Sequence, residues 1–190
     1  MNQVEKLAAK GLEAVGAHQR GATLAVDNSE VPRAAVRQLL TRGLHHLAAA
    51  HHQGAEQAAR NRDLAQNPDL RDTLQKGVEA NLSQAQRLEK VFAATGIAPG
   101  AVPDQAMQGI IDDNQAANAA ASGLALDLQL ISSGQLAAYF YVSSYGTLRS
   151  YAQLLGSDEA ADLLQQTLDE TLLVDANFTR LAHQVIIAAA

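Results

Sequence analysis

The sequence predicts an all-α fold, a bundle of long amphipathic helices packed side by side. Apolar residues recur at three- and four-residue spacing over most of the 190 residues, and no segment alternates as a β-strand does. The four prolines fall between the periodic segments, where the missing proline N–H breaks no helical hydrogen bond. Cysteine is absent, which excludes disulfides, thiolate metal sites and cysteine nucleophiles.

The N-terminal part of the chain divides into an extension and the start of the bundle. Residues 2–16 predict a weak first helix. A long helix then runs to about residue 66, with Ser29 as its predicted N-cap and Pro32 in its first turn. We therefore expect residues 1–30 to form a helical extension and residues 31–190 to form a single bundle domain.

Four further helical segments are expected after residue 66. Each begins at a capping residue or proline and ends at glycine or at a short polar turn. The next helix is predicted between Asn67-Pro68 and Gly96, and a shorter one between Pro103 and residues 122–123. A regular helix is predicted over residues 124–155 and ends at Gly156. The last helix is predicted to follow Ser157, which is its N-cap.

The segment from residue 124 to residue 155 carries a heptad seam, which is typical of a helix packed along its length against others. Long helices joined by short turns pack most simply as an antiparallel four-helix bundle, with additional helical pieces at its side. Gly109, Gly123 and Gly134 are predicted points of close helix packing. The two rows of the seam are Leu124, Ile131, Ala138, Tyr145 and Ala152, and Asp127, Gly134, Tyr141, Leu148 and Leu155.

The charge distribution disfavours nucleic acid as a partner. The net charge is −6, and residues 91–190 carry only 2 basic against 10 acidic side chains. An acidic half repels a phosphate backbone, and no basic cluster offsets it. There is no secretory signal pattern and no apolar run near the roughly 18 residues of a membrane span. We expect a cytoplasmic protein that does not enter a membrane.

Several short motifs point to one family. They are Ser144-Tyr145-Gly146-Thr147-Leu148, Thr167-Leu168-Asp169-Glu170, Ala106-Met107 ahead of Gly109-Ile110-Ile111-Asp112-Asp113, and Asn67-Pro68-Asp69-Leu70. Through these motifs, residues 40–185 resemble the YciE/YciF-type ferritin-like bacterial stress proteins. The resemblance implies a ferritin-like bundle, a role in stress response, and a homodimer. A second copy would also cover the apolar terminus of residues 185–190.

Ferritin-like families of this type build a two-metal site inside the bundle from carboxylates and histidine, because hard divalent cations prefer anionic oxygen ligands. The resemblance implies that most of these ligands are absent here. The family's histidine three residues after Glu79 is Leu82, its glutamates on the long helix fall on Ala138 and Tyr141, and Tyr139 replaces a further histidine. A phenol at such a position fills the site.

A rebuilt metal site would use the few ligand types that remain. The first-helix ligand aligns with either His51 or Glu56, and both alternatives stay open. Glu79 and Asp175 complete this candidate set, with iron or manganese as the metal. Our principal expectation is that the chain has no metal, no cofactor and no catalytic residue. We also expect the hydroxyl of Tyr141 or Tyr145 to bond to Asp175 or Glu79.

The histidine cluster does not have the spacing of a helical metal site. His45, His46, His51 and His52 are separated by one, five, six or seven residues, whereas two ligands on one helix face need a spacing of three or four. We expect these side chains to be exposed or hydrogen-bonded. Residues 112 and 113 are adjacent aspartates that diverge by about 100° on a helix and do not share a proton.

The sequence therefore favours a non-catalytic ferritin-like bundle with a structural or interaction role, linked by resemblance to stress response. The N-terminal extension is a candidate site for a protein partner. Two alternatives remain: a metal-binding oxidase or storage protein with a rebuilt site, and a small-ligand binder that uses the former metal cavity around Tyr141.

Overall fold

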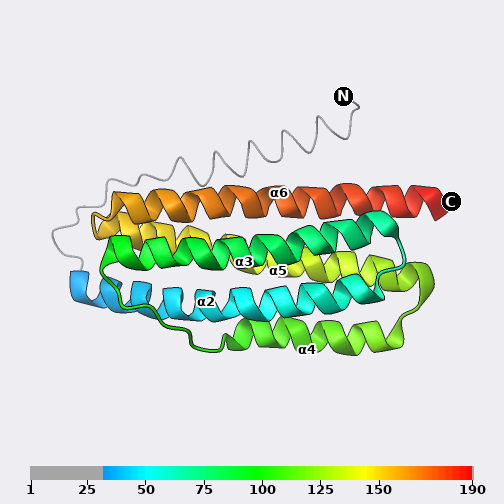
Figure 1. Ribbon diagram of the computed structural model, residues 1–190, viewed down its shortest axis with the longest axis horizontal. Helices are drawn as coiled ribbons and strands as arrows, with labels where there is room; N and C mark the ends of the chain where they lie inside the picture. Colours follow the sequence, from blue (N-terminus) through cyan, green and yellow to red (C-terminus); the bar gives the residue numbers. More distant parts are fainter. Residues whose placement is uncertain (1–31, 190) are drawn as a thin grey trace, which may run out of the picture.

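The computed structural model describes residues 32–189, and the side chains of residues 32–185. Three predictions lie outside the described part: the helix at residues 2–16, Ser29 as the N-cap of the long helix, and the covering of the apolar side chains after Val185. The described residues form five helices and no strand (Figure 1). The helices are α2 (Arg33–Leu64), α3 (Pro68–Thr95), α4 (Gln105–Ala120), α5 (Gly123–Leu154) and α6 (Asp158–Ala189).

Four of these helices form the bundle. α2 packs against α3, α3 against α6, α6 against α5, and α5 against α2, which closes a ring of four. Neighbours in the ring run antiparallel, whereas the diagonal pair α3 and α5 runs in the same direction (Figure 1). The predicted all-α, antiparallel four-helix bundle is confirmed.

α4 is the connection across the bundle. Because α3 and α5 run in the same direction, the chain must return along the bundle between them, as in ferritin-like folds. α4 makes this return while packing against α5 and α2 (Figure 1). Its 16 residues are half the length of α2 and α5, which have 32 each, so it covers only part of the seam between them.

Several helix boundaries follow directly from local sequence. The Asn67 side-chain oxygen accepts hydrogen bonds from the backbone N–H groups of Asp69 and Leu70 at 2.9 and 3.1 Å, and Pro68 is the first residue of α3. Gly96 ends α3 with a φ of 61°, a left-handed conformation that glycine adopts without steric cost. These two predicted boundaries are confirmed.

Two predicted helix starts lie too early in the sequence. Pro32 is the N-cap and not a first-turn residue, because the helix begins at Arg33. α4 begins at Gln105, two residues after Pro103, because the Asp104 carboxylate accepts a hydrogen bond from the Met107 N–H at 2.7 Å. A carboxylate satisfies a free N–H of the first turn, which proline cannot do.

Of the three glycines predicted as points of close helix packing, one has this role. A Cβ atom at Gly134 would overlap the ring of Phe178, so α5 and α6 approach closely there. Gly109 and Gly123 face open space and are not packing points. Gly123 instead has a φ of 57° at the start of α5, and this conformation favours glycine.

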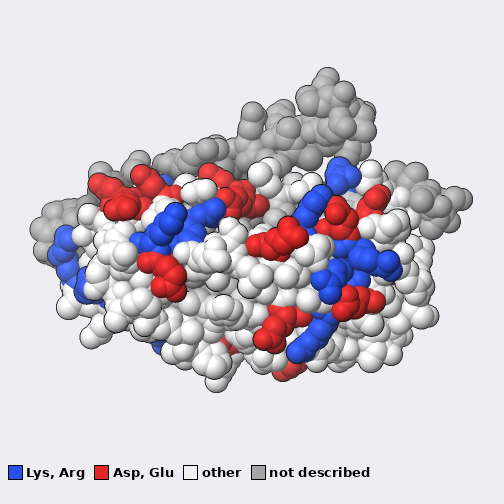
Figure 2. Space-filling view, in the orientation of Figure 1, with Lys and Arg blue, Asp and Glu red and all other residues white. Residues whose placement is uncertain are grey.

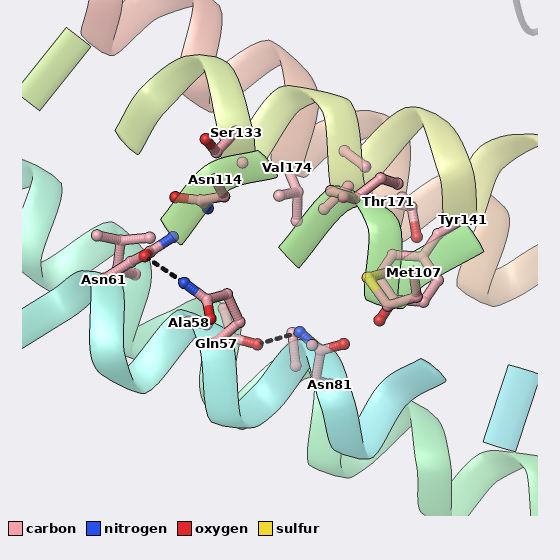
Figure 3. A pocket seen from close by; sticks show the side chains of 18 of the residues that line it. Gln57, Ala58, Asn61, Asn81, Met107, Asn114, Ser133, Tyr141, Thr171 and Val174 are labelled. Atoms are coloured by element: carbon pink, nitrogen blue, oxygen red, sulfur yellow. Dashed lines mark hydrogen bonds between the residues drawn. The ribbon is translucent and has the colours of Figure 1, made fainter. Parts of the chain in front are cut away.

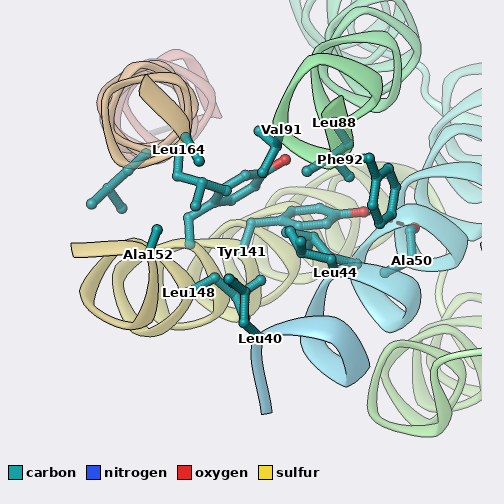
Figure 4. Packing of buried hydrophobic residues seen from close by; sticks show 14 of the residues in the cluster. Leu40, Leu44, Ala50, Leu88, Val91, Phe92, Tyr141, Leu148, Ala152 and Leu164 are labelled. Atoms are coloured by element: carbon teal, nitrogen blue, oxygen red, sulfur yellow. Dashed lines mark hydrogen bonds between the residues drawn. The ribbon is translucent and has the colours of Figure 1, made fainter. Parts of the chain in front are cut away.

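The core consists of two apolar clusters, one toward each end of the bundle. The larger contains Leu40, Leu44, Phe92 and Leu164, which Figure 4 shows packed between the helices. The smaller surrounds Leu70, Leu130, Phe178 and Leu181. The predicted α5 seam contributes to both clusters through Ile131, Tyr141, Tyr145, Leu148 and Ala152, whereas Leu124 is 43% exposed. Between the clusters lies a stretch of the bundle where the buried side chains are mostly polar.

The surface and hydropathy of the described residues add two observations. Basic and acidic side chains are interleaved on the face shown in Figure 2. Ion pairs among the described residues include Lys76–Asp72 and Arg87–Glu170. Within residues 32–189, no helix combines the length and the apolar content needed to cross a bilayer.

Candidate functional site

The stretch between the two apolar clusters, which we call the middle section, is the candidate site. It comprises residues 51–61 of α2, 77–84 of α3, 133–138 of α5 and 171–174 of α6, together with the part of α4 that packs over them. Its buried polar side chains are almost all neutral: His51, Gln57, Asn61, Gln84, Asn114, Asn118, Ser133 and Thr171.

A cavity of about 90 Å³ lies in the middle section (Figure 3). None of the described side chains that line it is charged. Glycine and alanine residues of several helices leave the space open, among them Gly77, Gly134 and Ala138. The remaining wall consists of apolar side chains such as Met107 and Val174, and of amides from α2, α3 and α4.

The amides form a network that joins α4 to α2. The Gln57 side chain donates to the Asn61 oxygen at 2.8 Å, and Asn118 donates to the same oxygen at 3.3 Å. Gln115 donates to the Gln57 oxygen at 3.0 Å. Buried amides need such partners because a lost hydrogen bond costs folding free energy, so this network fixes α4 against the bundle.

His51 is fully buried and both ring nitrogens are hydrogen-bonded. Nδ1 lies 2.9 Å from the Asn81 oxygen and Nε2 lies 2.6 Å from the Tyr145 hydroxyl. The Asn81 amide nitrogen donates to the Gly77 carbonyl, so its oxygen accepts from Nδ1–H and Tyr145 donates to Nε2. Burial lowers the pKa of His51 to about 4, and the hydrogen bond that Nδ1–H donates to the Asn81 oxygen opposes this shift. The imidazole is therefore neutral near pH 7.

Tyr141 fills the space beside this histidine. Its ring stacks on His51 with centroids 4.5 Å apart and an interplanar angle of 3°, and its hydroxyl donates to the Ala50 carbonyl at 2.8 Å. The expected bond from Tyr141 or Tyr145 to Asp175 or Glu79 is therefore wrong, because a backbone carbonyl and a histidine already satisfy both phenols.

The candidate carboxylates do not converge on His51. Glu56 is exposed and lies 3.7 Å from Arg60 one turn along the same helix. Glu79 is also exposed and accepts from Gln75. Asp175 is half-buried, where burial raises its pKa, with Gln135 and Tyr139 as opposing hydrogen-bond partners.

A further carboxylate, Glu170, lies at the edge of the middle section but is already paired. Arg87 donates to both of its oxygens at 2.7 and 2.8 Å and also to Thr167. Although burial favours the neutral acid, the hydrogen bonds from Arg87 and Gln84 lower the pKa of Glu170 below its usual value. This charge is balanced by arginine and is not a free metal ligand.

The residues of the middle section do not fit the two-metal centre of ferritin-like proteins. That centre needs several anionic oxygen ligands directed to one point. Across residues 32–185, no three histidine or carboxylate side chains lie close enough together to hold a metal ion. His51 could bind metal only by giving up one of its two hydrogen bonds.

The other histidines lie apart from the cavity. His45 Nε2 is 3.0 Å from the Ala98 carbonyl, and His46 Nδ1 is 3.5 Å from Asp104. His52 is exposed. The adjacent aspartates at positions 112 and 113 are exposed on α4, as expected from their divergence.

Sequence reasoning did not identify the buried amides. Their signal is present in the sequence, because amides occupy positions where the helical period calls for apolar residues. The buried pairs are Gln57 with Asn61 and Asn114 with Asn118, each four residues apart on one helix, and the partly buried Asn81 lies three residues before the buried Gln84.

Comparison with known proteins identifies the family. A family model described as Domain of unknown function (DUF892) matches residues 35–190. The chain belongs to this family. The protein YciF of Escherichia coli (strain K12) is 29% identical over 118 residues, which cover 61% of this chain and 71% of that protein. The resemblance to YciE/YciF-type proteins is confirmed.

Two solved structures of the same type share the bundle. YcfI, a putative structural protein from Rhodopseudomonas palustris, has a TM-score of 0.73 at 27% identity, over 76% of this chain and 92% of that one. The E. coli stress protein YciF has a TM-score of 0.77 at 24% identity, over 80% and 96%, and shows the fold. The predicted ferritin-like fold is thereby confirmed.

Proposed function

We propose that this member of the DUF892 family is a non-catalytic, cytoplasmic helical bundle with a structural or interaction role in bacterial stress response. One observation carries the proposal: the middle section holds neutral amides and a neutral His51, with the hydrogen-bonded phenols of Tyr141 and Tyr145 beside it, where ferritin-like enzymes hold charged metal ligands. The stress-protein name of E. coli YciF and the putative structural role given to YcfI support it.

The competing metal-dependent function makes a direct prediction. An oxidase or storage protein would retain iron or manganese through purification and would be stabilised by added metal. We expect purified full-length protein to contain less than one-tenth of an equivalent of either metal, roughly the level of adventitious binding, and to show no shift in Tm with Fe²⁺ under anaerobic conditions or with Mn²⁺. Stoichiometric metal that is lost in both Glu79→Ala and His51→Gln would overturn the proposal.

A homodimer is the expected assembly. Because α4 is short, part of the α2–α5 seam is left as an open groove, lined by Leu39, Val102, Phe140 and Tyr151. Leu39 is 49% exposed there. A second copy that packs its own groove against this one would remove these apolar side chains from water.

Light scattering after size exclusion tests the dimer. We expect twice the chain mass for wild type and a shift toward monomer for Leu39→Glu. Leu82→Glu is the matched control, since Leu82 is 46% exposed but lies on α3, outside the groove. Equal dimer fractions in wild type and Leu39→Glu would count against this interface.

The N-terminal extension is the proposed contact for a further partner or for the second copy. Removal of residues 1–30 should then change the oligomeric state, and an unchanged elution volume would refute the idea. Nucleic acid is not among the proposed partners, because the charge of residues 91–190 is strongly acidic.

A second candidate function is the binding of a small ligand in the middle section. The cavity of about 90 Å³ beside Tyr141 and Ala138 is the observation that favours it. Pressurised xenon is a suitable probe, because xenon enters apolar cavities that are large enough to hold it. Bound xenon near Tyr141 is the expected result, and no xenon in the bundle would remove this candidate.

A further inference from the structure

α4 buries less apolar surface than the other helices of residues 32–189. Its buried side chains are two apolar residues, Met107 and Ile111, and two amides, Asn114 and Asn118. Each of the other four helices buries five or more apolar side chains. Because burial of apolar surface is the main source of packing free energy, α4 is the most weakly held of these helices.

The hydrogen bonds of α4 do not make up for this difference. Asn118 donates to Asn61, and Gln115 donates to Gln57. These bonds contribute little net free energy, because water replaces them when α4 leaves the bundle. The side-chain oxygens of Asn114 and Asn118 are buried and have no hydrogen-bond partner among the described residues. Both oxygens gain bonds to water in the open state, which favours opening.

The other helices around the cavity are held more firmly. α3, α5 and α6 each contribute to both apolar clusters, with Phe92, Tyr145 and Leu164 in the larger one and Leu70, Leu130 and Phe178 in the smaller one. α4 contributes its buried side chains Met107 and Ile111 to the larger cluster only. Separation of α3, α5 or α6 therefore breaks both clusters, whereas separation of α4 leaves most of the core in place.

α4 is also one wall of the cavity in the middle section. It packs against α2 and α5, and Figure 3 shows Met107 among the side chains that line the space. α2 and α5 contribute small residues such as Gly54 and Ala137 to the same lining. Departure of α4 removes its whole contribution to the lining and thereby connects the cavity to solvent. That contribution consists of Met107, Ile110, Ile111 and Asn114.

We propose that α4 is the gate of this cavity. It separates from α2 and α5 as one unit while the four-helix bundle stays folded, and a small ligand enters the middle section through the opening. The inference rests on the second candidate function above, because it names the route by which that cavity is reached. The opening itself is a property of the fold and is measured without any ligand.

Native-state hydrogen exchange of the full-length protein tests the opening. Relative to their intrinsic rates, backbone amides in the middle of α4 should exchange about 100-fold faster than central amides of α3 and α6, which serve as the internal control. Equal protection in α4 and in these two helices means that α4 opens only when the whole protein unfolds. That result overturns the proposal.

An engineered disulfide tests whether the opening admits a ligand. The chain has no cysteine, so the double variant Asn61→Cys/Asn118→Cys carries the only two thiols. The two side chains are short and touch, with Asn118 Nδ2 3.3 Å from Asn61 Oδ1. Oxidation ties α4 to α2, and the same variant after reduction is the matched control. With pressurised xenon as the probe, we expect the exchange of bound xenon, followed by xenon NMR, to slow by about tenfold or more on oxidation.

The contrary results separate the gate from the binding function. Equal xenon exchange in the oxidised and reduced forms overturns the gate, because the ligand then has another route. Bound xenon together with full protection of the α4 amides in wild type also overturns the gate and leaves the second candidate function standing. Absence of bound xenon overturns the second candidate function and the gating role, whereas the opening of α4 is still decided by hydrogen exchange of wild type, which does not depend on the folding of the variant.

Discussion

Lowering the pH from 7 to 5 should destabilise the fold through one buried side chain, His51. Burial in the middle section lowers its pKa from 6.5 to about 4, the bond to Asn81 opposes this shift, and the nearby charge of His52 adds to it. Below pH 6.5 the unfolded chain binds a proton at this residue, whereas the folded chain does not until about pH 4. The unfolded state then holds more protons, so stability falls as the pH falls through this window.

The two pKa values set the size of the effect. With 6.5 in the unfolded state and about 4 in the folded state, the free energy of unfolding falls by about 2 kcal/mol between pH 7 and pH 5. The full difference, reached below pH 4, is about 3 kcal/mol. A loss of this size is measurable, because a whole domain is stable by only about 5–15 kcal/mol.

The contribution of His51 to this pH dependence can be isolated by urea unfolding of wild type and His51→Gln at pH 7 and pH 5. The substitution also removes contacts, but that cost is present at both pH values and cancels in the difference. Carboxylates such as Glu170 titrate equally in both proteins. We expect the loss between pH 7 and pH 5 to be smaller by about 2 kcal/mol in His51→Gln.

A second histidine provides the control. His52 is the next residue and is exposed, so His52→Gln should show nearly the same loss as wild type. If wild type and His51→Gln lose the same free energy between pH 7 and pH 5, then His51 titrates as a solvated side chain and the neutral, doubly hydrogen-bonded arrangement is refuted.

Three further predictions concern stability, each measured by thermal or urea unfolding. Gly134→Ala should destabilise by about 1–3 kcal/mol because its Cβ overlaps the buried ring of Phe178, whereas Gly146→Ala in the same helix meets nothing within 4 Å and should stabilise by up to about 1 kcal/mol; equal effects would refute the close approach. Asp127→Ala should cost about 2–3 kcal/mol, since this buried carboxylate accepts two backbone N–H bonds at 2.8 and 3.0 Å from the α2–α3 turn, and a loss below about 0.5 kcal/mol would contradict that. Asn67→Ala should cost about 1 kcal/mol through the lost cap, with Asn67→Ser as the variant that retains most of it.

The helices and their caps were predictable because their causes are local. Asn67 and Gly96 act within a few residues of themselves, and the apolar period of α5 is visible without any knowledge of its partners. The errors in the predicted helix starts also have local causes. Sequence reasoning placed the start of α4 at Pro103, whereas Asp104 is the capping residue and the helix begins after it.

The site was less predictable because its geometry depends on several helices at once. The family resemblance suggested that Glu79 is a metal ligand inside the bundle, but the structure places it at the surface with Gln75. The two hydrogen bonds of the His51 ring depend on Asn81 of α3 and Tyr145 of α5, which are 30 and 94 residues away in the sequence. No pattern within one helix carries that information.

By itself, the sequence determined an all-α bundle of the DUF892 family, because the helix period, the caps and the family motifs each depend on residues that are close together in the sequence. Only the tertiary structure decided what the interior of that bundle contains. Four helices and the α4 crossover bring amides into the middle section while Glu56 and Glu79 remain in water, and small residues leave a cavity beside Asn114. The physical reason is that burial and hydrogen bonding are properties of assembled helices and not of any one of them.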